Sequence, residues 1–128
     1  MGELTEGVSW IGVVAGAVVS FLVGWVWYSP KLFGRKWAEG TRVSLADASA
    51  MPVGALLSQA VGLLLMSWFV GVTATSNALL TVILATVAFG TLAYSGGMFA
   101  QQSGYARNVE AGYLAVSLVI MVICQGIF

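Results

Sequence analysis

The sequence predicts an all-α integral membrane protein with four transmembrane helices, and two observations lead to this fold class. Of the 128 residues, 59% are hydrophobic and only 8% are charged, whereas a soluble domain carries about 25% charged residues. The apolar residues also fall in runs of about 20, the length of helix that crosses a hydrocarbon core. In lipid such runs are expected to be helical, because each backbone polar group then has a partner within its own segment.

Four segments are long and apolar enough to be spans, and together they form one domain over residues 1–128. The spans are approximately residues 8–28, 53–72, 78–95 and 109–128, and the longest connection is the loop 29–52. The first span is not a signal peptide, because Glu3 and Glu6 precede it where a signal peptide carries basic residues.

The basic residues predict the orientation. All five lie on the same side of the predicted spans: Lys31, Arg35, Lys36 and Arg42 follow the first span, and Arg107 precedes the fourth. Lys and Arg are enriched in cytoplasmic loops. We therefore expect a multi-pass protein of the inner membrane with the loop 29–52 in the cytoplasm and both termini outside.

The segment after the first span predicts a short helix in the membrane interface. Ser29 can cap this helix, Pro30 can occupy its first position and Gly40 can end it, which places it over residues 31–39. A pattern typical of a capping box at Ser44 predicts a further short helix before the second span, and Asn108 is a candidate cap for the fourth span. Aromatic and basic side chains around the interfacial helix are candidate anchors or contacts to anionic lipid. They are Trp25, Trp27, Lys31, Arg35, Lys36 and Trp37.

Small residues recur at every fourth position in two spans. The first span has Gly12, Gly16, Ser20 and Gly24, and the second has Gly54, Ser58 and Gly62. Helices in membranes associate by close packing of such residues. Both series therefore predict helix–helix contact faces, and the partner of each is either another helix of this chain or another copy.

The two halves of the chain also share a pattern. Gly24, Tyr28, Ser29 and Phe33 recur in register at Gly90, Tyr94, Ser95 and Phe99. This pattern predicts two tandem helical hairpins related by an axis along the membrane normal.

Few residues could carry chemistry. The chain has no His and a single Cys, Cys124, in an apolar stretch, so we expect no catalytic residues, no metal site and no cofactor. The net charge of zero suggests no nucleic-acid partner.

Glu110 is the one acid close to the predicted hydrocarbon. An ion pair with Arg107, three residues earlier on the same helix, accounts for it without a functional role. The alternative is a coupling acid, because ionisable groups inside membranes are often functional. Other polar residues in or near the spans complete a candidate ligand or coupling site. Its members are Gln59, Thr91, Ser95, Arg107, Glu110 and Tyr113.

Two motifs resemble an uncharacterised family of small bacterial membrane proteins, known as domain of unknown function 1761. The first motif is the exit from the first span, residues 24–38, with Tyr28, Phe33-Gly34 and Trp37. The second is Ala111-Gly112-Tyr113 in the last span. The resemblance covers the whole length and implies four spans, but no activity. Family members often have Asn where Glu110 stands here, which weakens the hypothesis of a shared essential acid.

Two functions fit these features, neither of them enzymatic. The first is membrane-embedded binding or transport of a small molecule or ion by a homo-oligomer. The alternative is a structural or accessory subunit that docks a larger membrane complex through its glycine-rich helix faces. A polar cavity lined by Gln59, Thr91 or Glu110 would favour binding or transport. A dry core with an exposed glycine face would favour docking.

Overall fold

The structure, a computed structural model, describes residues 2–29, 31–41 and 53–128. Its helices are α1 (Gly2–Thr5), α2 (Trp10–Trp27), α3 (Gly34–Thr41), α4 (Val53–Ala74), α5 (Leu79–Phe99) and α6 (Gly104–Ile127). The predicted role of Pro30 and the predicted helix at Ser44 lie outside the described residues.

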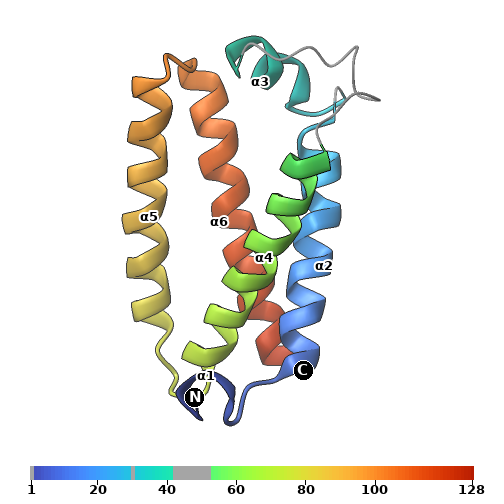
Figure 1. The fold of residues 1–128 in the computed structure, drawn as a ribbon, viewed down its shortest axis with the longest axis vertical. Helices are drawn as coiled ribbons and strands as arrows, with labels where there is room; N and C mark the ends of the chain where they lie inside the picture. The colour runs from blue at the N-terminus through green and yellow to red at the C-terminus, as the bar shows by residue number, and fades with distance from the viewer. Residues whose placement is uncertain (1, 30, 42–52) are drawn as a thin grey trace.

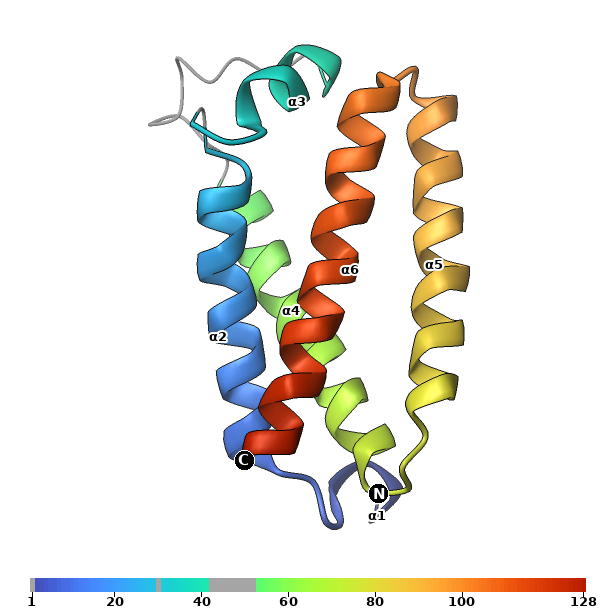
Figure 2. The same cartoon turned by 180° about the vertical axis from the view of Figure 1, so that it is seen from behind.

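Four of these helices are long and apolar enough to cross a membrane, α2, α4, α5 and α6, which confirms the predicted fold class. They stand side by side, with α4 crossing the others obliquely (Figures 1 and 2). Both termini lie at one end of the bundle, and α3 lies across the opposite end, where α2 ends and α6 begins (Figure 1). We call this opposite end the α3 end.

Two helices extend beyond their predicted spans, because hydropathy detects only the apolar part of a helix, and one predicted cap was wrong. The helix α6 begins at Gly104 rather than 109, and its cap is Ser103, whose Oγ accepts a hydrogen bond from the Ala106 N–H at 3.0 Å. Asn108 lies within α6 and is not its cap. The helix α5 continues to Phe99, four residues beyond the predicted end.

The interfacial helix also differs from the prediction. Residues 31–33 form a turn, in which the N–H groups of Leu32 and Gly34 donate to the Ser29 carbonyl oxygen at 3.1 and 2.9 Å. The helix α3 therefore starts at Gly34, and it runs through Gly40 to Thr41 rather than ending before it.

The small residues of α2 lie against α6. Gly12, Gly16, Ser20 and Gly24 are all buried. A methyl group added at Gly12 would lie 3.2 Å from the Cys124 carbonyl oxygen, and one at Gly16 would lie 3.3 Å from the Met121 Cα. These contacts advance by one turn in each helix, as expected for antiparallel neighbours.

The same register continues towards the α3 end. A methyl group at Gly24 would lie 2.6 Å from the Tyr113 Oη, and this hydroxyl donates to the Ser20 carbonyl oxygen at 2.6 Å. This register predicts that Ser20 and Ser117, both buried, occupy facing positions of the α2–α6 contact. Neither hydroxyl has a hydrogen-bond partner in the described part of the chain.

The helix α4 joins this pair through Ser67. Its buried hydroxyl donates to the Val13 carbonyl oxygen at 2.7 Å and stands 2.7 Å from the position that a Gly16 methyl group would occupy. Beside this junction the apolar core is formed by Leu63, Val70, Val82 and Met121. The helices α2, α4 and α6 thus meet at one junction, and α5 adds Val82 to the core beside it.

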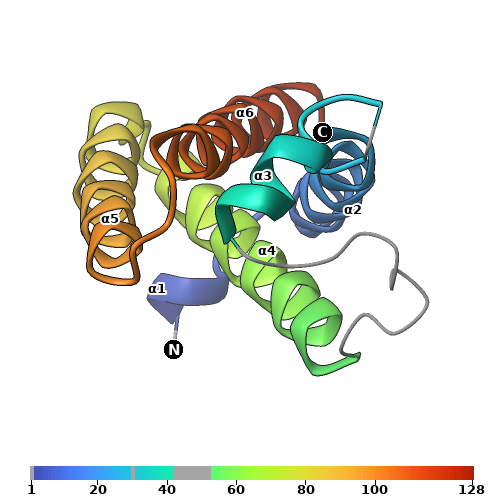
Figure 3. The same cartoon turned by 90° about the horizontal axis from the view of Figure 1, so that it is seen from above.

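The helix α5 stands at the edge of the bundle (Figure 3). Val82 is its only buried residue among those described. It packs on α6 and makes few contacts with α4, whereas α2 packs closely on α6. The two halves of the chain are therefore packed differently, and the tandem repeat stays a prediction about the sequence.

We expect Gly16→Ala to destabilise the protein by about 1–3 kcal/mol, because the added methyl group would overpack the junction of α2, α4 and α6. Unfolding in mixed micelles, followed by tryptophan fluorescence, measures this change. Gly62→Ala is the matched control, because a methyl group there would meet no atom within 4 Å in the described part of the chain. Equal effects of the two substitutions would contradict the packing described above.

The serines provide a second test. We expect Ser67→Ala to cost about 0.5–1.5 kcal/mol, because it removes a buried hydrogen bond to the α2 backbone. Ser20→Ala removes a hydroxyl without a partner among the described residues, so the same unfolding measurement should give an unchanged or higher stability. A larger loss for Ser20→Ala than for Ser67→Ala would show that the Ser20 hydroxyl has a partner in the folded protein.

Candidate functional site at the α3 end

Two glycines allow α3 to lie across the end of the bundle. A methyl group at Gly34 would overlap the Tyr28 carbonyl oxygen, and one at Gly40 would overlap the Ser103 side chain. The Ser103 N–H also donates to the Gly40 carbonyl oxygen at 3.1 Å. The chain therefore turns sharply after α2, and the end of α3 is fixed to the start of α6.

An aromatic cluster fills the space between α2, α3 and α6. The ring of Tyr28 lies 4.9 Å from that of Trp37 and 5.5 Å from that of Tyr113. The ring of Trp27 lies 4.8 Å from that of Phe33 and 6.4 Å from that of Tyr113. Tyr28 follows the end of α2, and its burial, with smaller contributions from the charges of Glu110 and Tyr113, raises the pKa of its phenol well above the usual range.

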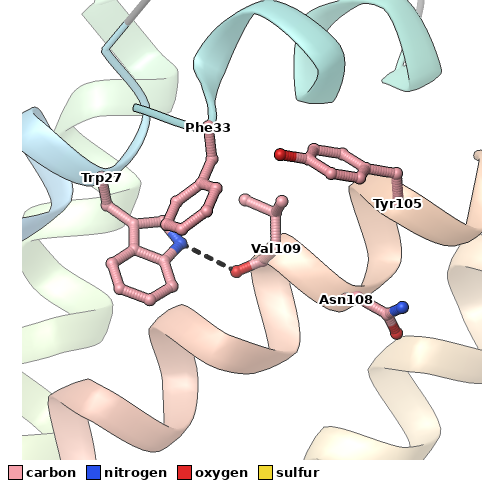
Figure 4. A pocket seen from close by; sticks show the side chains of 5 residues that line it. All are labelled: Trp27, Phe33, Tyr105, Asn108 and Val109. Atoms are coloured by element: carbon pink, nitrogen blue, oxygen red, sulfur yellow. Dashed lines mark hydrogen bonds between the residues drawn. The ribbon is translucent and has the colours of Figure 1, made fainter. Parts of the chain in front are cut away.

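Indole N–H groups join this cluster to α6. The Nε1 of Trp27 donates to the Val109 carbonyl oxygen at 2.9 Å (Figure 4). The Nε1 of Trp37 donates to the Glu110 Oε1 at 3.0 Å. Two of the three tryptophans predicted to be interfacial anchors thus hold the fold together, whereas Trp25 is exposed.

Glu110 connects three segments and does not form the ion pair with Arg107 that the spacing predicted. Its Oε1 also accepts from the Gln102 Nε2 at 3.0 Å, and the same amide donates to the Thr41 Oγ1 at 2.9 Å. The carboxylate therefore bridges α3 and the turn before α6.

Arg107 points to a different set of partners. Its Nη1 donates to the Gln102 carbonyl oxygen at 2.7 Å, and its guanidinium lies 5.0 Å from the centre of the Tyr94 ring. Tyr94 in turn donates to the Asn108 Oδ1 at 3.0 Å. Spacing of three residues permits an ion pair within a helix, but here the carbonyl oxygen and the aromatic ring hold the guanidinium.

The six predicted ligand or coupling residues divide into two groups. Arg107, Glu110 and Tyr113 gather at the α3 end of α6. Gln59 is exposed on α4, and Thr91 on α5 donates to its own helix at the Val87 carbonyl oxygen, 2.7 Å away. Ser95, half-buried, lies one turn further along α5.

Sequence reasoning missed Thr41, Gln102 and Tyr105 at this end. The first two carry polar contacts between α3 and the turn before α6. Tyr105 lies beneath the Lys36 ammonium group, with 5.3 Å between the nitrogen and the ring centre. No spacing pattern joins residues so far apart in the chain, so only the docking of α3 reveals them.

Two shallow cavities adjoin the α3 end. The first, of about 250 Å³, is lined by Trp27, Phe33, Tyr105, Asn108 and Val109 (Figure 4). The second, of about 360 Å³, is lined by Val19, Leu22, Val23, Val26, Trp27 and Leu32. Trp27 borders both, and neither is lined by Gln59, Thr91 or Glu110. Among the described residues, no cluster of three or more His, Cys, Asp or Glu side chains could hold a metal ion.

We expect Gly40→Ala to displace α3, because the added methyl group has no room beside Ser103. Amide hydrogen exchange over residues 34–41 should then become faster, while exchange in α2 changes little. The control is Gly104→Ala, where the nearest atom to the added methyl group is the Arg107 Nη2 at 3.6 Å, an ordinary contact. Unchanged exchange in the Gly40 variant would mean that α3 does not rest on α6 at this point.

The two sequence motifs that resemble domain of unknown function 1761 meet at the α3 end. Tyr28 and Trp37 of the first motif contact Tyr113 and Glu110 beside the second. No curated protein and no solved structure matches this chain. A protein-family model, described as a protein of unknown function (DUF1761), matches residues 11–126. The match covers most of the chain, which therefore belongs to the DUF1761 family.

Proposed function

We propose that this protein is a structural subunit that docks another membrane protein on the open face of α4. One observation carries the proposal. Methyl groups added at Gly54 and Gly62 would meet no atom of the described residues within 4 Å. Ser58 between them is exposed, and its only bond to a described residue is the one it donates to its own helix, at the Gly54 carbonyl oxygen, 2.8 Å away.

The contrast with α2 supports this interpretation. Small-residue faces let helix backbones approach closely in lipid, where apolar side chains gain little by leaving the acyl chains. The face of α2 with this spacing is covered by α6, whereas that of α4 is covered by no described residue. A helix of another molecule could approach α4 as closely as α6 approaches α2.

Gln59 supports a second copy of this chain as the partner. It is exposed on the flank of the α4 face and makes no hydrogen bond to another described residue. An amide both donates and accepts, so two Gln59 side chains related by a twofold axis would satisfy each other. In hydrocarbon, an amide without a partner is costly.

Binding or transport of a small molecule or ion is the second candidate. It is supported by the position of Gln59, which would place a polar group between copies within the membrane. The two cavities at the α3 end are shallow, so the proposed pathway would form at such an interface.

We also propose the orientation that the basic residues favour. Lys31, Arg35, Lys36 and Arg107 lie towards the α3 end, which would then face the cytoplasm with the termini outside. In this arrangement the protein is a non-enzymatic component of the inner membrane.

We expect the protein to have the mass of a dimer or larger assembly in gentle detergent, and the double variant Gly54→Leu/Gly62→Leu to be a monomer. Leucine side chains would hold a partner helix away from α4. Native mass spectrometry or light scattering measures the mass. Gly96→Leu is the matched control, because Gly96 is equally open but lies on α5, and it should assemble as the wild type does.

The outcomes separate the parts of the proposal. A wild-type protein that is strictly monomeric and free of any partner would overturn docking. If the wild type instead co-purifies with a different membrane protein and the double variant does not, the proposal of docking on α4 is supported and the proposal of self-association is wrong.

A further inference from the structure

An apolar groove runs along α2 as it approaches the α3 end. Val19, Leu22, Val23 and Val26 lie on one side of the helix, and Leu32 from the turn after α2 covers the end of the groove. From Val19 to Val26 the groove extends along about 10 Å of helix, at 1.5 Å per residue. This is the length of several methylene groups of an acyl chain.

The turn at residues 31–33 separates this groove from the first cavity, the one lined by Phe33 and Tyr105. Leu32 lines the groove, the next residue Phe33 lines the cavity, and Trp27 borders both. The Trp27 indole N–H is already bonded to Val109, 2.9 Å away. Its ring therefore forms a fixed wall between the two hollows.

A lysine is associated with each hollow. Lys31 precedes Leu32 of the groove in the chain, and Lys36 lies over the ring of Tyr105, which lines the first cavity. Both lysines are exposed, and neither forms an ion pair in the ranges that the structure describes. Their charges are available to an external anion.

We propose that this site binds one anionic phospholipid from the leaflet at the α3 end. An acyl chain lies in the groove along α2 beneath Leu32, and the headgroup phosphate lies between Lys31 and Lys36 near the Tyr105 hydroxyl. A ligand with an apolar chain and an anionic end matches the apolar lining of the groove and the two exposed lysines, which form no ion pair in the described ranges. The inference is independent of docking on α4, which uses a different surface.

Native mass spectrometry with defined lipids tests the site. Purified protein is mixed with phosphatidylglycerol or with phosphatidylcholine of the same acyl chains, and the fraction that retains one lipid is measured. The wild type should retain phosphatidylglycerol preferentially. Lys31→Gln/Lys36→Gln should reduce this preference by roughly fivefold for each charge removed, and Lys31→Arg/Lys36→Arg should preserve it.

The groove is tested separately by filling it. Val23→Trp should reduce retention of both lipids, and Leu22→Trp replaces it as the test if the first variant does not fold. The control is Leu84→Trp on α5, which is 70% exposed and distant from the groove, and it should retain lipid as the wild type does. Unchanged preference in the double lysine-to-glutamine variant, or equal loss from Val23→Trp and Leu84→Trp, would overturn the proposal.

Discussion

The structure depends on the close approach of α2 and α6. Gly12, Gly16 and Gly24 leave room for the side chains and backbone of the facing helix, so the two helices stay in contact over most of their length. Larger side chains would hold the helices apart, and the bond from Tyr113 to the Ser20 carbonyl oxygen could not form. In lipid, such packing and a few buried hydrogen bonds replace the hydrophobic driving force of soluble proteins.

The arrangement of side chains at the α3 end depends on the close contact between α2 and α6. Because α2 and α6 are antiparallel, the end of one meets the beginning of the other, and the aromatic residues after α2 face those of early α6. Trp27 and Trp37 then reach Val109 and Glu110. The end of α2 and the segment after it therefore contribute internal contacts, through the indoles of Trp27 and Trp37, and an exposed charged surface, through Lys31 and Lys36.

The sequence predicted the four spans and the small-residue face of α2, because hydropathy and a repeat of small residues at every fourth position are local properties of a helix. It did not predict what covers such a face. On α2 the face with this spacing is covered by α6, whereas on α4 it is covered by no described residue. It also misplaced the start of α6, since Gly104 to Asn108 extend the helix beyond its apolar part. Glu110 lies near Arg107 in sequence, yet its partners Trp37 and Gln102 depend on how α3 docks.

The most direct test of this account is disulfide formation between α2 and α6. In a Cys124→Ala background, Ser20→Cys and Ser117→Cys should cross-link rapidly with copper phenanthroline in native membranes, because facing positions in a close helix pair meet the geometry of a disulfide. Peptide mass spectrometry would detect the bond. Ser20→Cys with Val119→Cys, on the exposed side of α6, should not cross-link. Absence of the first bond, or equal formation of both, would contradict the proposed register of α2 on α6.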